Sequence, residues 1–410
     1  MKKKTLLLLI SFIFFLAAVS HAILFELSNI KDTLITYQDI LEIKEKAGNT
    51  TKIRVNNVLL NLKNNLLHCA FILHPGKNLI NIQDIGQFRV LRLISFPDLS
   101  NLYNGRFHWA KKEIEALATL GILEGFPDGN YYMNDSATRG EFATWLCKAQ
   151  GLMTDNPKED PFKDVPKEHW RSRYIKAVAD KGYMEADTTG SFGIDINISR
   201  AEAAVTCLKA EEPSINEVVS IDFFEDVPLI HPLFKQLKIA KALGLIKGIS
   251  LNSPLFEPDR DITRAETAIL LSRLKRVASL KKELYDFQTE YTDDDFAKIN
   301  IPPEILSAKA SPESITINTP SAITINAMTR NRDGLEKILY VKSDLSSLNN
   351  FADVQMYDDG TNGDTLKGDG NYTIKFLASA EATGEKNINI IAGDNLGWKD
   401  YKNIKVLVVE

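Results

Sequence analysis

The sequence has little cysteine and, beyond its N-terminus, no long apolar run. Its three cysteines are an odd set without a Cys-x-x-Cys pair, which argues against a disulfide framework and against a zinc site. We therefore expect Cys69, Cys147 and Cys207 to be small buried apolar residues. No later run approaches the roughly 20 apolar residues of a membrane-spanning helix, so we expect no transmembrane segment in the mature chain.

The signatures of common enzymes and of nucleic-acid-binding proteins are also missing. The sequence contains no nucleophile elbow, no phosphate-binding loop and no pair of catalytic acids in a recognisable context. A net charge of -5 over 410 residues disfavours nonspecific binding to nucleic acid. We therefore expect a protein that is not an enzyme and has no nucleic-acid partner.

The first residues have the pattern of an export signal. Lys2, Lys3 and Lys4 are a positive start, residues 6–19 are a short apolar core, and small residues at Ser20 and Ala22 suit a cleavage site. An uncleaved anchor is the alternative, but the apolar run is shorter than a spanning helix needs. We predict a signal peptide at residues 1–22 and an exported protein.

The strongest signal is an internal repeat of two helices joined by a loop. A His and a Gly lie 13 residues apart in each copy, at His108 and Gly121, His169 and Gly182, and His231 and Gly244. Apolar residues between them recur at helical spacing, and the Gly is a natural C-cap. A second helix follows at 142–150, 203–209 and 267–275, after a tetrad with the composition of a capping box. The predicted caps are Thr138 and Glu141, Ser199 and Glu202, and Thr263 and Glu266.

These copies resemble S-layer homology (SLH) repeats. The matching elements are an Asp-Val start at Asp164-Val165, His169-Trp170, a Gly-Ile-x-x-Gly turn at 121–125, Pro127-Asp128-Gly129, and an Ile-Thr-Arg-Ala-Glu helix start at 262–266. The resemblance implies SLH repeats at residues 100–154, 160–214 and 220–280 that form a pseudo-threefold helical prism. Three departures argue against equal binding by all copies: the first lacks the Asp-Val start, the second has Ala186 where the others have Gly, and the third has Pro232 in place of Trp.

The resemblance also implies non-covalent anchoring to the bacterial cell envelope through an acidic, pyruvylated wall polysaccharide bound between repeats. Arg139, Arg200 and Arg264 each begin a capped helix, where free backbone N–H groups and a guanidinium favour a carboxylate. A solvated surface arginine is the alternative for each. Trp109 and Trp170 either stack on a sugar or fill the core, and Gly125 and Gly248 lie where a ligand could approach the backbone.

The segments on either side of the repeats have the pattern of strands. Residues 23–98 and 301–410 alternate apolar and polar positions between turn-forming residues, and both are similar to bacterial immunoglobulin-like β-sandwich modules. Residues 281–300 are charged and irregular, which predicts a linker. The predicted fold is therefore multidomain: a small immunoglobulin-like β domain at 23–98, three helical repeats, a linker, and a β-sandwich at 301–410.

One loop in the last segment concentrates possible calcium ligands, namely Asp358, Asp359, Asn362, Asp364 and Asp369. The EF-hand pattern is not matched, because Gly360 occupies the third position and the twelfth lacks a bidentate Glu. Two Gly-rich β-turns are the favoured interpretation, so no cofactor is required.

Two rival functions are also compatible with the sequence. The repeats could serve assembly, as a structural component of a surface layer or as a tether between outer membrane and peptidoglycan, with the β modules contacting other envelope proteins. Such repeats also tether hydrolases, although neither flanking segment carries a recognisable catalytic set.

Overall fold

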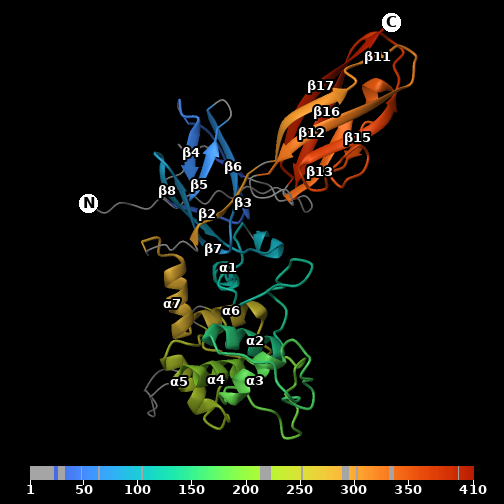
Figure 1. The fold of residues 1–410 in the computed structure, drawn as a ribbon. Helices are drawn as coiled ribbons and strands as arrows, with labels where there is room; N and C mark the ends of the chain where they lie inside the picture. The colour runs from blue at the N-terminus through green and yellow to red at the C-terminus, as the bar shows by residue number, and fades with distance from the viewer. Residues whose placement is uncertain are drawn as a thin grey trace.

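The computed structural model describes residues 23–25, 33–47, 49–62, 65–102, 105–212, 223–250, 253–288, 295–301, 303–331, 337–395 and 397–410. The predicted signal peptide at residues 1–22 lies outside these ranges. Figure 1 shows a helical region at the bottom, an N-terminal β module above it, and a C-terminal β module at the upper right. Within the described ranges, no helix combines the length and the apolar character that crossing a membrane requires.

The N-terminal β module consists of two sheets that enclose one apolar cluster. Strands β1 and β3 pair in parallel, as do β2 and β8, and the other pairs are antiparallel. One sheet has the order β1 (Ile23–Phe25), β3 (Ile40–Lys46), β6 (Leu66–Ile72) and β9 (Lys298–Asn300). The other has the order β2 (Thr33–Thr36), β8 (Gly86–Arg92), β7 (Gly76–Ile82), β4 (Lys52–Val55) and β5 (Val58–Asn61).

The helical region confirms the predicted repeat of two helices. In each copy a Gly directly follows the C-cap residue of the first helix, and its positive φ of 70° at Gly121, 69° at Gly182 and 74° at Gly244 is the left-handed conformation that commonly terminates a helix. The second helix begins at the predicted Arg in each copy. The helices are α1 (Lys111–Thr119), α2 (Arg139–Gln150), α3 (Ser172–Asp180), α4 (Arg200–Glu211), α5 (Phe234–Ala242), α6 (Arg264–Ser272) and α7 (Lys275–Leu284).

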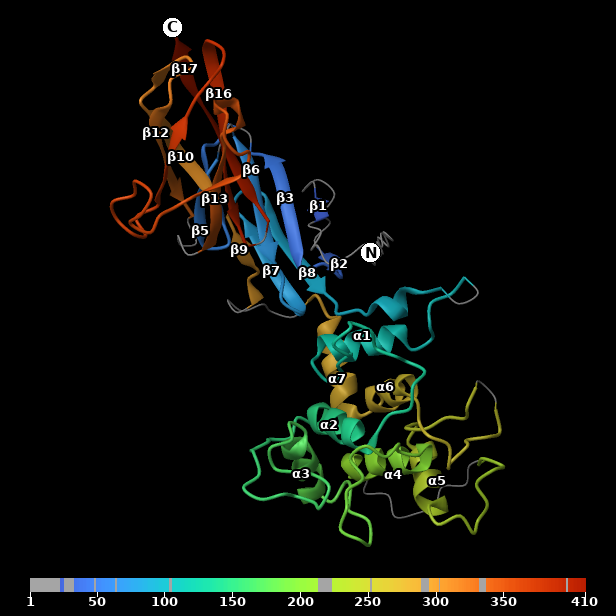
Figure 2. The same ribbon diagram turned by 90° about the vertical axis from the view of Figure 1, so that its right-hand side faces the viewer.

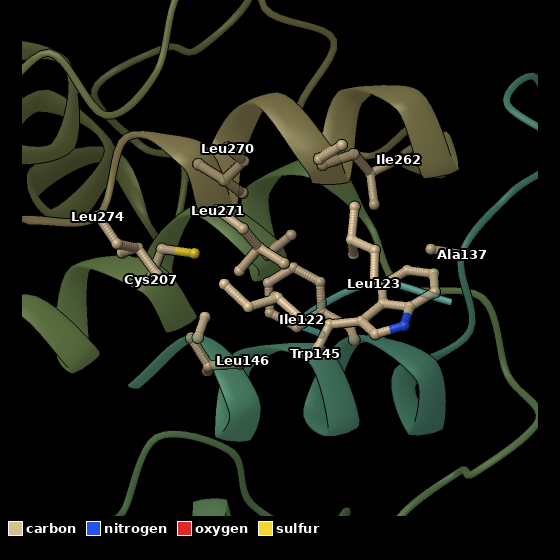
Figure 3. Close-up of a cluster of buried hydrophobic side chains, with 14 of the residues drawn as sticks. Ile122, Leu123, Ala137, Trp145, Leu146, Cys207, Ile262, Leu270, Leu271 and Leu274 are labelled. Carbon is tan, nitrogen blue, oxygen red and sulfur yellow. The ribbon is translucent and has the colours of Figure 1, made fainter. Parts of the chain in front are cut away.

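The repeats contact one another in a closed ring. Helix α2 packs against α3, α4 against α5, and α6 returns to pack against α1. The second helices of the three copies share one buried cluster, in which Trp145 of α2, Cys207 of α4 and Leu271 of α6 are all buried (Figure 3). Because every copy covers the apolar faces of two others, the ring has one common core.

All three cysteines are free and buried, as predicted. Burial raises the pKa of the Cys147 thiol to about 11 and that of Cys69 to about 12. These thiols therefore act as apolar core groups at neutral pH.

The predicted linker at residues 281–300 differs from the structure. Helix α7 runs through Leu284, and β9 is a strand of the N-terminal sheet. Charged residues dominate α7, but Val277 and Leu284 are buried, so the helix is amphipathic and packs on α1, α2 and α6. The linker was predicted because few apolar residues stand among many charged ones, so the apolar face of the helix was not apparent from the sequence.

The C-terminal β module consists of a three-stranded and a five-stranded sheet that face each other across a second apolar cluster. The three-stranded sheet has the order β10 (Glu304–Ser311), β12 (Ser321–Arg330) and β15 (Asn371–Ala378). The five-stranded sheet has the order β11 (Ser314–Thr316), β17 (Lys399–Val409), β16 (Gly384–Asp394), β13 (Ile338–Asp344) and β14 (Val354–Met356).

The assignment of both β modules as immunoglobulin-like stays a prediction. The two parallel pairs in the N-terminal module depart from the antiparallel sheets of immunoglobulin domains.

Candidate functional site

The loops before the second helices meet at the centre of the ring. Ala137 donates its N–H to the carbonyl of Ile262 at 2.9 Å, Ile262 donates to Ile198 at 3.0 Å, and Ile198 donates to Ala137 at 3.0 Å. These three backbone hydrogen bonds form a closed cycle with one residue from each repeat. The arginines that begin α2, α4 and α6 follow these residues by two positions and are therefore held in equivalent places.

Each of these arginines forms an ion pair with the helix-start glutamate of another repeat. Arg264 lies 2.6 Å from Glu141, Arg200 lies 2.7 Å from Glu266, and Arg139 pairs with Glu202. The pairs run from the first repeat to the second, from the second to the third, and from the third back to the first. We call these six residues the Arg–Glu ring.

Backbone carbonyls and aromatic rings complete the surroundings of each guanidinium. The Nε of Arg139 donates to Phe192 O at 2.7 Å, that of Arg200 to Phe256 O at 2.8 Å, and that of Arg264 to Tyr131 O at 2.8 Å. Each guanidinium also lies over the ring of that same aromatic residue, at 4.9, 4.8 and 4.6 Å from its centroid. The ring is thus a set of partly to fully desolvated, hydrogen-bonded charge pairs.

The structure places the three predicted glycan-binding arginines between repeats but gives each an internal partner. Their side chains are 13% exposed at Arg139, 8% at Arg200 and 2% at Arg264. Burial lowers the pKa of Arg139 and Arg200 from the ordinary value, and nearby carboxylates oppose this. Direct contact of these arginines with a glycan stays a prediction, and Arg139 is the most accessible of the three.

Two of the three predicted capping boxes are complete. Thr138 and Glu141 cap α2 reciprocally, as Thr263 and Glu266 cap α6. At α4 the Ser199 side chain accepts from the Glu202 N–H, but the reciprocal bond is missing among the described contacts. The Glu202 carboxylate instead faces Arg139, so its predicted role as a cap is replaced by a role in the ring.

An aspartate before each first helix holds the loop that leads to the second helix. Asp164 accepts from the N–H groups of Phe192, Gly193 and Ile194, and Asp226 accepts from those of Phe256 and Glu257. These bonds lower the pKa of Asp164 below its ordinary value, although burial alone would raise it.

The first repeat has the same aspartate, at Asp98, which sequence reasoning missed. Asp98 accepts from the N–H groups of Tyr131 and Tyr132 at 3.1 and 2.8 Å. The first copy lacks an Asp-Val pair, as predicted, but Asp98-Leu99 stands in its place. Phe96-Pro97-Asp98-Leu99 has the pattern of Phe162-Lys163-Asp164-Val165, and extra residues before His108 displace it.

Gly125 and Gly248 have a structural reason that is independent of any ligand. A Cβ at Gly125 would lie 2.7 Å from the Asn130 carbonyl oxygen, and one at Gly248 would lie 2.5 Å from that of Ser253. The close approach of the loop to the turn thus requires glycine. A glycan contact at these two residues stays a prediction.

Trp109 and Trp170 are exposed, so the interpretation that they fill the core is wrong. Their exposed fractions are 62% and 52%. The Arg171 guanidinium lies over the Trp170 ring at 4.4 Å, and the T-shaped neighbour of that ring is Tyr174. An exposed aromatic face beside a cation suits an acidic sugar. The third repeat has exposed Pro232 at this position.

The groove between the first and second repeats brings several charged side chains together. Lys148 pairs with Glu124 at 2.6 Å, and Arg171 lies 3.9 Å from Glu141, the partner of Arg264. Three cations thus face these two carboxylates, and the charge of Asp195 also acts on Arg171. The Nε of Arg171 and one carboxylate oxygen of Glu124 are buried and have no hydrogen-bond partner. We call this set the first groove.

The groove between the second and third repeats is balanced in charge and hollow. Its equivalent residues are Lys209, which pairs with Glu185 at 3.0 Å, and Glu202, which pairs with Arg139. Thr206 and Leu233 occupy the places of Trp145 and Arg171. The smaller side chains leave a cavity of about 210 Å³, which is lined by Tyr183, Met184, Glu185, Glu202, Val205, Thr206, Lys209 and Leu233. We call this set the second groove.

In the C-terminal module, the carboxylates of Asp358, Asp364 and Asp369 lie within 4.8 Å of one another. Asp358 accepts from the N–H groups of Gly368, Asp369 and Gly370, Asp364 accepts from Gly360, and Asp359 accepts from Thr361. These are the bonds expected of Gly-rich turns. Calcium binding by this loop stays a prediction.

Comparison with known proteins identifies the repeats. The family model of the S-layer homology domain matches residues 106–143, 161–204 and 223–268, and each match spans the first helix of one copy and the start of its second helix.

Three relatives illustrate the contexts in which similar sequences occur. The chain is 28% identical over 238 residues to the S-layer protein EA1 of Bacillus anthracis, and the aligned region covers 57% of this chain and 26% of that protein. It is 29% identical over 149 residues to the cellulosome-anchoring protein of Acetivibrio thermocellus, covering 35% and 32%. It is also 29% identical over 168 residues to an amylopullulanase of Thermoanaerobacterium thermosulfurigenes, covering 40% and 9%. The chain therefore spans about a third or less of each of these relatives.

Proposed function

We propose that this S-layer homology domain protein anchors itself non-covalently to the bacterial cell envelope. Its ligand on this proposal is an acidic wall polysaccharide with a pyruvylated sugar, bound in the grooves between neighbouring repeats. The names of the relatives support anchoring, since an S-layer protein and a cellulosome-anchoring protein share the repeats. Location at the cell surface or cell wall belongs to the same proposal.

The first groove carries the proposal. An exposed indole at Trp170 offers a flat apolar face to a sugar ring, and Arg171 lies over it with a buried Nε that has no partner. Lys148 and Arg264 add positive charge beside Arg171, and their partners are Glu124 and Glu141. A carboxylate on a sugar would accept from the Arg171 guanidinium.

The second groove supports binding in a different way. Its cavity of about 210 Å³ offers space for a sugar, and Lys209 is one of the residues that line it. Arg139 donates to the Glu185 carbonyl and pairs with Glu202, and both of these residues also line the cavity. Each groove alone is expected to bind modestly. Because the polymer repeats and the grooves are held in one ring, simultaneous occupation raises the overall affinity by effective concentration.

We propose no catalytic role for this chain. The amylopullulanase shows that these repeats occur in a protein named as an enzyme, but the match covers only 9% of that protein. The Glu141, Glu202 and Glu266 carboxylates, which could be mistaken for catalytic acids, are paired with arginines of the ring.

The test is retention of the full chain on purified peptidoglycan sacculi, before and after chemical removal of the attached acidic polymer. We expect binding to intact sacculi and its loss after stripping. Lys209→Ala should weaken binding, and Lys176→Ala is the matched control because Lys176 pairs with Asp180 on an exposed helix face.

Equal binding to intact and stripped sacculi, or none to either, would contradict the proposal. Assembly would then become the leading function, as a structural component of a surface layer or as a tether between outer membrane and peptidoglycan. Ordered lattices formed by the purified protein without glycan would support that role.

A further inference from the structure

Strand β9 belongs to the N-terminal β module, although it follows all three repeats in the chain. Residues Ala70, Phe71 and Ile72 of β6 pair antiparallel with Asn300, Ile299 and Lys298. Figure 2 shows β9 beside the strands of this module. The module is therefore built from two chain segments, residues 23–93 and residues 295–301, with the helical region between them.

The residues just before β9 also form hydrogen bonds and apolar contacts with the module. Asn56 donates its side-chain N–H to the Ala297 carbonyl at 2.9 Å, in a buried contact between residues 241 positions apart. Ala297 donates its own N–H to Leu79 O at 3.1 Å and belongs to the apolar cluster of the module. Without this segment the buried Asn56 amide and the β6 edge would lose their partners, which is costly for buried polar groups.

The helical region is attached to the module where the chain enters it. Tyr37 before β3 donates to Glu115 of α1 at 3.2 Å, and Ser95 after β8 donates to the same carboxylate at 2.5 Å. Lys111 pairs with Glu115 at 2.5 Å, and Leu91 and Leu93 belong to the apolar cluster of the repeats.

A second attachment lies where the chain leaves the helical region. Lys77 of β7 donates to the Asp286 carbonyl at 2.8 Å, just after α7. The helical region is therefore held at both of its ends by the same β module.

The C-terminal module is attached at β9 as well. Asn300, the last residue of β9, donates its side-chain N–H to the Asp394 carboxylate at 3.0 Å in a buried contact. The ring of Trp398 lies 4.9 Å from that of His68 on β6. Only residues 301–303 separate β9 from β10, so β9 pairs within the N-terminal module and adjoins the C-terminal module.

We infer that the helical repeats are an insertion within the N-terminal β module, and that β9 is the strand that joins the three modules into one rigid body. A force on the C-terminal module then reaches the repeats through the β6–β9 pairing and not through a flexible linker. This rigid body holds the C-terminal module in a fixed orientation relative to the repeats. This inference does not depend on what the repeats bind.

Hydrogen–deuterium exchange on the full chain tests the inference directly. In the wild-type protein we expect slow exchange of the amides at 298–300 and 70–72, comparable with that of the neighbouring strand β3. Ala297→Glu places a charge in the apolar cluster and should speed exchange at both sites by about tenfold or more, while the amides of α1 to α6 keep their protection. Lys298→Ala is the matched control, because this side chain of β9 is exposed, and it should leave exchange unchanged.

Small-angle X-ray scattering on the full chain supplies the second readout. Asn300→Ala removes the contact with Asp394 without adding charge, and we expect the maximum dimension to rise and its distribution to broaden. Fast exchange at 298–300 in the wild-type protein would overturn the inference even if Ala297→Glu fails to fold. Identical scattering of wild-type protein and Asn300→Ala would overturn the fixed placement of the C-terminal module.

Discussion

Arg264 at the start of the last repeat helix donates to Glu141 in the first repeat, over 2.6 Å and across 123 positions of sequence. Arg264 also donates to the carbonyls of Tyr131 and Glu124, so its guanidinium is held on every side by the first repeat. The repeats are thus closed into a ring, and the third copy supports the first as directly as its chain neighbour does.

Replacing Arg264 by Ala should destabilise the helical region strongly. Removal of one partner from a buried pair typically costs about 3 to 5 kcal/mol, and here it leaves Glu141 with only the more distant Arg171 at 3.9 Å. We expect that loss in the free energy of unfolding, measured by urea with circular dichroism at the helix band. Arg173→Ala is the control, because Arg173 is an exposed arginine of α3.

Arg264→Lys separates charge from geometry at the same position. Lysine keeps the charge but lacks the fork that reaches three acceptors, so we expect only partial recovery of stability. Equal stability of Arg264→Ala and Arg173→Ala would show that the ring does not hold the repeats together.

The sequence predicted the repeats well because their signals are local. The starts of the second helices, the Gly after each first helix and the Thr138 cap all depend on residues within a few positions of one another, and each is present in the structure. The burial of Arg264 could not be predicted, since an arginine at a capped helix start has the same pattern whether it is exposed or enclosed. Its surroundings come from the loop of a repeat more than 120 positions away.

Insertions and long-range pairing account for the other differences. Asp98 was missed because extra residues separate it from His108, whereas Asp164 and Asp226 stand closer to their histidines. Strand β9 was assigned to a linker because a three-residue strand has no alternation to detect. Its strand character comes from pairing with β6, which lies more than 220 positions earlier.

Asp98→Ala should destabilise the first repeat although that copy seemed to lack this residue. Two backbone N–H groups, of Tyr131 and Tyr132, would lose their acceptor, at a cost of about 1 to 3 kcal/mol. Urea unfolding of the full chain measures the loss. Asp155→Ala is the control, since Asp155 is exposed, and a similar small effect of both changes would contradict the assigned role of Asp98.

The ring also predicts how stability depends on acid. Burial alone would raise the pKa of Glu266, but hydrogen bonds from Arg260 and Thr263 and the charge of Arg200 outweigh burial and lower the pKa. A carboxyl group with a lowered folded pKa stabilises the fold above its unfolded value of about 4.3. That contribution is lost as the pH falls through the lower, folded pKa.

We therefore expect Glu266→Gln to be less stable than the wild type at pH 7 and to lose less stability between pH 7 and pH 3. Unfolding free energies at four or five pH values across that range measure both effects. Parallel pH profiles for the two proteins would show that Glu266 is not a source of acid sensitivity.

Arg171→Ala should weaken binding to the acidic wall polymer more than any neighbouring surface change does. The guanidinium lies over Trp170, and its Nε has no partner in the first groove, so an anionic sugar is the group that would complete its hydrogen bonds. A hydrogen bond between charged groups is worth about 1.5 to 3 kcal/mol, which corresponds to roughly a ten- to hundredfold loss of affinity. Calorimetric titration of the full chain with the purified polymer measures it, at two salt concentrations, because removing a cation should also weaken the salt dependence.

The matched variants decide whether Arg171 acts by contact or by supporting the fold. Lys176→Ala, on an exposed face of α3, should bind as the wild type does. Arg171→Lys should recover the part of the affinity that charge supplies, but not the part that depends on the geometry of the guanidinium. Trp170→Ala should weaken binding without changing the salt dependence, since stacking on a sugar carries no charge. If Arg171→Ala binds as tightly as Lys176→Ala, the first groove is not a site, and binding would have to reside in the second groove beside Lys209.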